Sequence, residues 1–416
     1  MTSVEGVEAR RAALRMLDAV LRRGQTLDAA SSRVTNLPPP DRALAIAIAG
    51  EVFRRLPDLD ALIDSATRQR LADDSKARMV LRLALAQKIG LGTPDHALVS
   101  TALPLVDGGP RRLVHGVLGT LLRRGVSATA APKLPAHVEE RWQEAWGEPV
   151  VEAARRQIAK RPPLDLTFAD DAVAERYATE QGGTSLAPRN VRLESSSVTD
   201  LPGFVEGRWW VQDLAASFPA RLIPTDAHDI LDLCAAPGGK TMQLAAAGHD
   251  VTAVDSSKSR LGRLRENLER THLDATLVEA DALDWRPARE YDAILLDAPC
   301  SATGTFRRHP EVLYRARPRI ITANAELQAQ LLDRASGWVK PGGTLVYSVC
   351  SLEPQEGEDV IKAFVAKCDD FTLAPPIGLR RFIEPTADGF LRILPGLLEP
   401  EGGLDGFFIA RLVRGG

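Results

Sequence analysis

Two cysteines stand where a reactive pocket can form. Cys300 lies three residues after Asp297, Cys350 lies two residues after Ser348, and each follows a short apolar segment typical of a strand. A thiolate is a strong nucleophile. One of its uses is attack on C6 of a pyrimidine, which makes C5 carbanion-like and able to accept a methyl group from a sulfonium donor. The residues alone do not decide which thiol attacks.

The other cysteines, Cys234 and Cys368, are expected to be inert, although the backbone of Cys234 belongs to a glycine loop. None of the four cysteines forms a Cys-x-x-Cys pair or stands beside a histidine at metal spacing. The pattern therefore favours neither zinc nor a disulfide framework, and it predicts a reduced, cytoplasmic protein without a metal.

A glycine-rich turn follows the first strand of the second half of the chain. Such a turn lets the backbone approach a ligand and presents free N–H groups at the start of the next helix. Gly239-Lys240-Thr241 invites a P-loop interpretation, but Cys234 stands where that motif requires glycine. The expected cofactor loop consists of Cys234, Ala235, Ala236, Pro237, Gly238, Gly239 and Lys240.

Acidic residues at three strand ends support a nucleoside site in the same crevice. Asp255 can bind the hydroxyls of a ribose held over the first turn. Asp281 can face the adenine edge, and Asp297 can meet N3 and the exocyclic amine of a cytosine. A single aspartate in such a place more often caps the following helix. Three of them beside a glycine loop favour an adenosine site.

Strands and helices that alternate along the second half must position these residues. Apolar runs of strand length separated by helical patterns predict a doubly wound parallel sheet. The expected strands are Ile230–Leu233, Val251–Asp255, Ala275–Glu279, Ala293–Asp297, Thr344–Ser348 and a last one over Gly406–Leu412, and the clearest helices are Lys258–Arg270 and Asn324–Val339.

The first half has helical periodicity throughout and differs in charge. Helices are expected over Arg42–Phe53, Leu59–Arg68, Ala77–Lys88, Ala97–Leu105 and Leu113–Leu122, after a first one around Ala12–Leu21. Residues 1–135 hold 20 Lys+Arg against 13 Asp+Glu, a net charge of +7, and the remainder holds 32 against 42, a net charge of −10. A basic module suggests a polyanionic partner, and the alternative is a solvated helical surface without one.

Length and composition set the frame for these interpretations. The 416 residues are long enough for two or three domains, and we expect boundaries at 1–126 (all-α), 127–207 (a small mixed α+β linker domain) and 208–416 (α/β). The overall charge of −3 excludes a uniformly basic nucleic-acid coat. No apolar run reaches membrane-spanning length, and Met1–Leu17 is not expected to be a signal peptide.

Four motifs together resemble those of the RNA cytosine-5 methyltransferases of the Sun/Nop family. They are Asp232–Thr241, Asp297–Thr305, Tyr347–Ser351 and Asp405–Phe408. The resemblance implies a Rossmann-like class I methyltransferase domain that uses S-adenosyl-L-methionine. It also implies that Cys350 is the covalent nucleophile, that Cys300 assists product release, and that the glycine loop with Asp255, Asp281 and Asp297 contacts the cofactor or the target base. The DNA cytosine-5 enzymes use the cysteine after proline instead.

The all-α half resembles the NusB-like domain of the bacterial family member that modifies small-subunit rRNA. The expected function is therefore 5-methylcytosine formation in 16S rRNA, a step of rRNA processing, by a monomer that binds RNA and no membrane. Two alternatives stay open. One is the same chemistry on tRNA or large-subunit rRNA, and the other is an RNA-binding factor with an inactive methyltransferase half.

Overall fold

The computed structural model describes residues 6–194, 198–376 and 383–416. Residues 1–5 lie outside the described residues. They belong to Met1–Leu17, which is not expected to be a signal peptide. The chain divides into a helical unit, Met1–Lys160 with Phe306–Ala316, and a sheet unit, Arg161–Thr305 with Arg317–Gly416. These boundaries differ from the expected ones at residues 126 and 207. Residues 127–160 belong to the helical unit, and so does Phe306–Ala316 from the second half of the chain.

Helices make up the described part of the helical unit. Their bounds are α1 Val7–Leu21, α2 Leu27–Ser31, α3 Pro39–Ser65, α4 Lys76–Leu91, α5 Asp95–Ala102, the 3₁₀ turn η1 Leu103–Leu105, α6 Gly108–Arg124, α7 Ala136–Trp146, α8 Glu148–Ile158 and α13 Val312–Arg315. Local chemistry sets several ends: the Ser75 hydroxyl accepts a hydrogen bond from the backbone N–H of Arg78 at the start of α4, and Gly92, with a φ of 63°, ends it.

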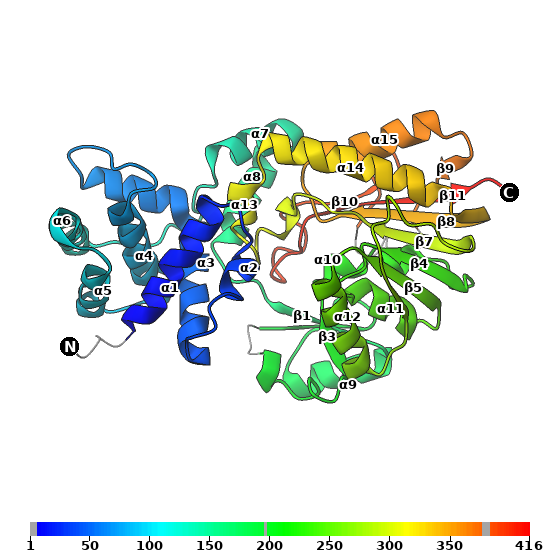
Figure 1. Cartoon of the computed structure of the whole chain (residues 1–416), viewed down its shortest axis with the longest axis horizontal. Helices are drawn as coiled ribbons and strands as arrows, with labels where there is room; N and C mark the ends of the chain where they lie inside the picture. Colours follow the sequence, from blue (N-terminus) through cyan, green and yellow to red (C-terminus); the bar gives the residue numbers. More distant parts are fainter. Residues whose placement is uncertain (1–5, 195–197, 377–382) are drawn as a thin grey trace. The chain divides into compact units, whose positions relative to one another are not determined.

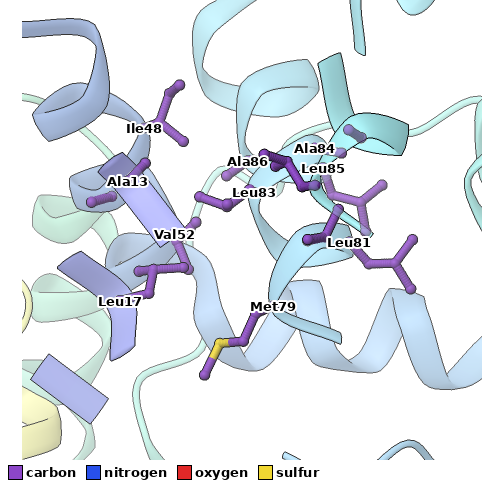
Figure 2. Packing of buried hydrophobic residues seen from close by; sticks show 14 of the residues in the cluster. Ala13, Leu17, Ile48, Val52, Met79, Leu81, Leu83, Ala84, Leu85 and Ala86 are labelled. Atoms are coloured by element: carbon purple, nitrogen blue, oxygen red, sulfur yellow. The ribbon is translucent and has the colours of Figure 1, made fainter. Parts of the chain in front are cut away.

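Small and branched side chains from α1, α3 and α4 fill the core of the helical unit (Figure 2). The prediction of two helices over Arg42–Phe53 and Leu59–Arg68 is wrong, because α3 runs through Pro57 as one helix. An interior proline costs about 3 kcal/mol. The helix continues because apolar residues on both sides of Pro57, such as Phe53 and Leu59, are fully buried on the same core.

The segment Phe306–Ala316 follows the Cys300 loop in sequence and packs within the helical unit. The rings of Phe306 and Trp142 lie 5.5 Å apart. The hydroxyl of Tyr314 donates a 2.9 Å hydrogen bond to the carbonyl oxygen of Phe53. These contacts make the segment part of the helical unit, although in sequence it lies between two parts of the sheet unit.

The sheet unit contains a small and a large sheet. In chain order its elements are β1 Leu164–Phe168, α9 Asp171–Gln181, β2 Asn190–Leu193, η2 Val198–Asp200, β3 Trp209–Val211, α10 Leu214–Ser217, η3 Ala220–Leu222, β4 Asp229–Leu233, α11 Gly239–Ala246, β5 Asp250–Asp255, α12 Lys258–Thr271, β6 Thr276–Glu279, β7 Tyr291–Asp297, η4 Thr303–Thr305, α14 Pro318–Ser336, β8 Val339–Val349, η5 Pro354–Glu356, α15 Glu358–Lys367, β9 Phe371–Leu373, β10 Leu391–Ile393 and β11 Phe407–Arg414. The small sheet has the order β2-β1-β3.

The large sheet is mixed, with the order β10-β11-β8-β7-β4-β5-β6 and β9 paired to β11. Strands β4 to β8 pair in parallel, as predicted. One edge departs from the parallel arrangement, because β11, whose direction was not predicted, runs antiparallel to β8, β9 and β10. The parallel strands bring the glycine loop, Asp255, Asp297 and Cys350 to one edge of the sheet.

Helices cover both faces of the large sheet, with α14 and α15 on one side and α11 and α12 on the other (Figure 1). Alternate residues of β7 point to opposite faces: Ile294 and Leu296 join the core under α14, and Leu295 joins the opposite core. Burial on both faces explains the nearly continuous apolar strands. Every helix of the described residues is too short or too polar to span a bilayer.

Candidate active site

The glycine loop connects the end of β4 to the start of α11. Cys234 adopts a left-handed backbone conformation with a φ of 59°, and Gly238 has a φ of 105°. A Cβ atom at Gly238 would lie 2.0 Å from Cδ1 of Leu264, so this position needs glycine for both backbone and space. The backbone N–H of Ala235 donates to the carbonyl oxygen of Val254, which holds the loop against β5.

Asp255, at the end of β5, binds the glycine loop to α12. Its carboxylate accepts hydrogen bonds from the backbone N–H groups of Ala236 at 3.3 Å and Ser257 at 2.8 Å. The guanidinium of Arg260 lies 2.9 Å from the same carboxylate, which is almost fully buried. Arg260 was not predicted from the sequence, although its place in the first turn of the helix after a strand-end acid indicates such a contact.

A cavity of about 110 Å³ lies between this carboxylate and α14. Its lining residues are Cys234, Val254, Asp255, Ser256, Arg260, Ala280, Asp281, Ala282, Pro299, Leu327 and Leu331. Burial raises the pKa of the Cys234 thiol to about 12, so it stays protonated and serves as part of the wall. The carboxylate at one side is a group that a ribose would contact, and the leucines at the other side are groups that an adenine ring would contact.

Asp297, at the end of β7, is held by two neighbours. Nζ of Lys240 lies 2.7 Å from one carboxylate oxygen, and the Ser348 hydroxyl donates a 2.8 Å hydrogen bond to the other. The Asp297 side chain stays 32% exposed while that of Lys240 is only 10% exposed. Lys240 was predicted as a cofactor residue by its place in the loop, and in the structure its ammonium holds Asp297.

The two thiols predicted to share a pocket are neighbours: Sγ of Cys300 lies 3.5 Å from Sγ of Cys350. The pKa of Cys300 lies well above the ordinary thiol value, because its hydrogen bond with Cys350 and its burial both oppose ionisation. Cys300 therefore stays protonated at neutral pH. The Cys300 loop also lies close to the segment before β11, since a Cβ at Gly304 would lie 2.0 Å from the carbonyl oxygen of Gly406.

Two further acids complete the description. Asp232 is fully buried and accepts a 2.6 Å hydrogen bond from the Thr241 hydroxyl, and burial raises its pKa to about 7. Asp281 lies two residues beyond the end of β6 rather than closing it, and its carboxylate accepts a hydrogen bond from the Leu283 backbone. The aspartate of this pair that lines the cavity is Asp281.

A glycine loop after the first parallel strand and a carboxylate at the end of the next strand are the features by which a Rossmann-like domain holds a nucleoside cofactor. Class I methyltransferases hold S-adenosylmethionine on such a domain.

Comparison with known proteins gives the family. Residues 219–413 match the 16S rRNA methyltransferase RsmB/F family, and residues 7–123 match the NusB family. Ribosomal RNA small subunit methyltransferase B of Salmonella typhi is 34% identical over 97% of both chains, and that of Pseudomonas putida is 34% identical over 97% of this chain and 98% of its own. The crystal structure of PH0851 has the same fold, with a TM-score of 0.75 and 22% identity over 98% of both chains.

The chain therefore belongs to the 16S rRNA methyltransferase RsmB/F family and is an S-adenosylmethionine-dependent methyltransferase. The resemblance to the Sun/Nop enzymes, the NusB-like first half and the cofactor are thereby confirmed. The roles of individual residues remain predictions.

Replacing Asp255 by Asn is expected to weaken S-adenosylmethionine binding about 10- to 100-fold in calorimetry. The ribose hydroxyls would lose a charged acceptor, and a hydrogen bond to a charged group contributes about 1.5–3 kcal/mol. Asp250→Asn is the matched control, because Asp250 opens the strand that Asp255 closes and is exposed. Equal affinity in the two variants would exclude Asp255 from the cofactor site.

Proposed function

We propose that this enzyme transfers a methyl group to C5 of a cytosine in 16S rRNA through a covalent bond between Cys350 and C6. The named relatives are small-subunit rRNA methyltransferases. The observation that carries the chemistry is the 3.5 Å separation of the Cys300 and Cys350 sulfurs. Two neighbouring thiols suit a reaction in which one thiol attacks the cytosine and the other assists its release.

Each step uses a residue of the site. The Cys350 thiolate forms a bond to C6, and the electron pair moves to C5. The bound cofactor supplies an electrophilic methyl group there. The Asp297 carboxylate accepts a hydrogen bond from the exocyclic amine of the cytosine, beside N3, and Lys240 keeps the Asp297 side chain in place. A base then removes the proton from C5, the electron pair re-forms the C5–C6 bond, and the bond from Cys350 to C6 breaks.

Cys300 suits the role of the group that assists release. Its hydrogen bond with Cys350 is the largest influence that raises its pKa. Once the Cys350 sulfur is bonded to C6 it carries no negative charge. Its effect on the pKa of Cys300 therefore becomes weaker. This change favours a role of Cys300 after the first step.

The direct test is methylation of unmodified RNA by the purified chain with labelled S-adenosylmethionine, followed by bisulfite sequencing. Labelled 5-methylcytosine in 16S rRNA supports the proposal. Label confined to tRNA or 23S rRNA would support the same chemistry on another RNA. Cofactor binding without transfer to any of the three would support an RNA-binding factor with an inactive enzyme half.

We also propose that the helical unit binds the RNA. The enzyme would act as a monomer without a metal, and it would work in the cytoplasm, where ribosomes are assembled. Three arginines support the RNA contact. Arg15, Arg23 and Arg33 line a hollow of about 600 Å³ beside α1, and all three are exposed. Cationic side chains around a hollow can neutralise phosphates.

A triple variant with Arg15, Arg23 and Arg33 changed to Ala is expected to bind rRNA more weakly. The slope of log affinity against log salt should fall by about 2 to 3, since each lost phosphate contact removes about 0.7–0.9. A filter-binding titration over a series of salt concentrations measures both quantities.

A second triple variant, with Arg42, Arg68 and Arg112 changed to Ala, changes the net charge equally. Equal losses in the two variants would show that overall charge rather than this hollow binds RNA. Deleting residues 1–126 is a poorer test, because it would remove Phe53 and so uncover Tyr314, whose ring packs against it.

A further inference from the structure

A buried carboxyl group lies at the junction of the two cysteine loops. Glu356 ends the 3₁₀ turn η5, six residues after Cys350, and has no exposed surface. Its carboxylate is surrounded by hydrogen-bond donors. Burial raises its pKa, while each of these hydrogen bonds favours the ionised form. The mechanism proposed above does not use this group.

The donors come from the residues that directly follow the two cysteines. Ser301 donates to Oε1 through its backbone N–H at 2.8 Å and to Oε2 through its hydroxyl at 2.5 Å. The Ser351 hydroxyl also donates to Oε2. The hydroxyls of Ser301 and Ser351 lie 3.2 Å apart. One carboxylate thus holds the loop after Cys300 and the loop after Cys350.

Two further contacts fix Glu356 itself. Nδ2 of Asn324, on α14, donates a 2.9 Å hydrogen bond to Oε1. The Tyr347 hydroxyl, on β8, donates a 2.6 Å hydrogen bond to the backbone carbonyl of Glu356. The carboxylate is therefore anchored to the body of the sheet unit and cannot follow one loop away from the other.

We propose that Glu356 is a positioning residue that sets the distance between the Cys300 and Cys350 sulfurs through Ser301 and Ser351. The inference rests on the proposed function for its consequence in catalysis, because both thiols must reach one cytosine. Each oxygen of the carboxylate accepts two donors, so loss of the group would leave the Ser301 N–H and two hydroxyls without their buried acceptor. Buried groups without partners drive local rearrangement.

The sulfur-to-sulfur distance can be measured without RNA. Dibromobimane becomes fluorescent when it bridges two neighbouring thiols, and Cys300→Ala and Cys350→Ala define the background. In Glu356→Ala the bridging rate above this background is expected to fall about tenfold. The kcat for methylation should fall about 10- to 100-fold, while the affinity for S-adenosylmethionine and the KM for RNA stay within about twofold of wild type.

Glu356→Gln should restore bridging and kcat to within about threefold of wild type. Its carbonyl oxygen can accept from the Ser301 N–H, and its amide can donate to the two hydroxyls, which rotate to accept. Asp359→Ala is the matched control, because Asp359 is an exposed acid three residues further on, and it should change nothing. A merely structural role for Glu356 would not move the bridging rate and kcat together at constant KM.

Wild-type bridging in Glu356→Ala, or Glu356→Gln no better than Glu356→Ala, would overturn the proposal. Should Glu356→Ala fail to bind the cofactor, Ser351→Ala decides instead, because it removes one donor; several-fold slower bridging supports the proposal and unchanged bridging refutes it. Failure of the proposed function looks different, since wild type would then methylate no RNA while bridging normally.

Discussion

A Cys350→Ala variant is expected to transfer no methyl group to RNA and to form no covalent bond with it. Without the sulfur nothing attacks C6, and C5 of cytosine never becomes nucleophilic. We expect the rate to fall at least about 10⁴-fold, as for other enzymes that lose their nucleophile. Transfer of a tritiated methyl group to rRNA, with a denaturing gel for the adduct, measures both properties.

The variant should still bind S-adenosylmethionine, because Cys350 is not among the residues that line the cavity proposed for the cofactor. Cys368→Ala is a suitable control, since this thiol lies after α15 and should not affect the rate. A covalent RNA adduct in Cys350→Ala would show that Cys300 attacks, as the equivalent cysteine does in the DNA cytosine-5 enzymes.

A Cys300→Ala variant is expected to behave in the opposite way and to accumulate a covalent enzyme–RNA species. Cys350 can still attack C6 and the methyl group can still be transferred, but the thiol 3.5 Å away that assists release is absent. The steady-state rate should fall about 10²- to 10⁴-fold, the usual range for loss of a positioned acid or base. The adduct should run above the free enzyme on a denaturing gel.

The Cys300→Ala, Cys350→Ala double variant provides the control, because it should form no adduct. Bisulfite sequencing or mass spectrometry of the trapped RNA should find the cytosine already methylated. Trapped but unmethylated cytosine would place Cys300 before methyl transfer and contradict the proposed order. Rapid turnover without an adduct would exclude Cys300 from the reaction.

Much of the fold follows from local sequence patterns. The parallel strands β4 to β8 were predicted within a few residues, because strands buried on both faces must be continuously apolar. The helices of the first half follow from their 3.6-residue periodicity. Two features do not follow from local patterns. Helix α3 continues through Pro57 because burial of the apolar residues on both sides of it offsets the free-energy cost of an interior proline. The antiparallel edge at β11 depends on its pairing with β8, which lies far away in sequence.

The same distinction between local sequence and tertiary contacts applies to the candidate site. The glycine loop, the strand-end acids Asp255 and Asp297 and the proximity of Cys300 to Cys350 were predictable from the sequence, because parallel strands bring their carboxyl ends to one edge. These are consequences of residue type and of position along an element, which a sequence shows directly.

Which side chains contact one another depends on the folded chain. Lys240 lies against Asp297 and Arg260 against Asp255. Phe306–Ala316 packs within the helical unit, and Glu356 lies between the two cysteine loops. No periodicity encodes such contacts, because each joins segments with different neighbours in sequence. Their partners are selected by packing density and by the cost of leaving a buried polar group without a hydrogen bond.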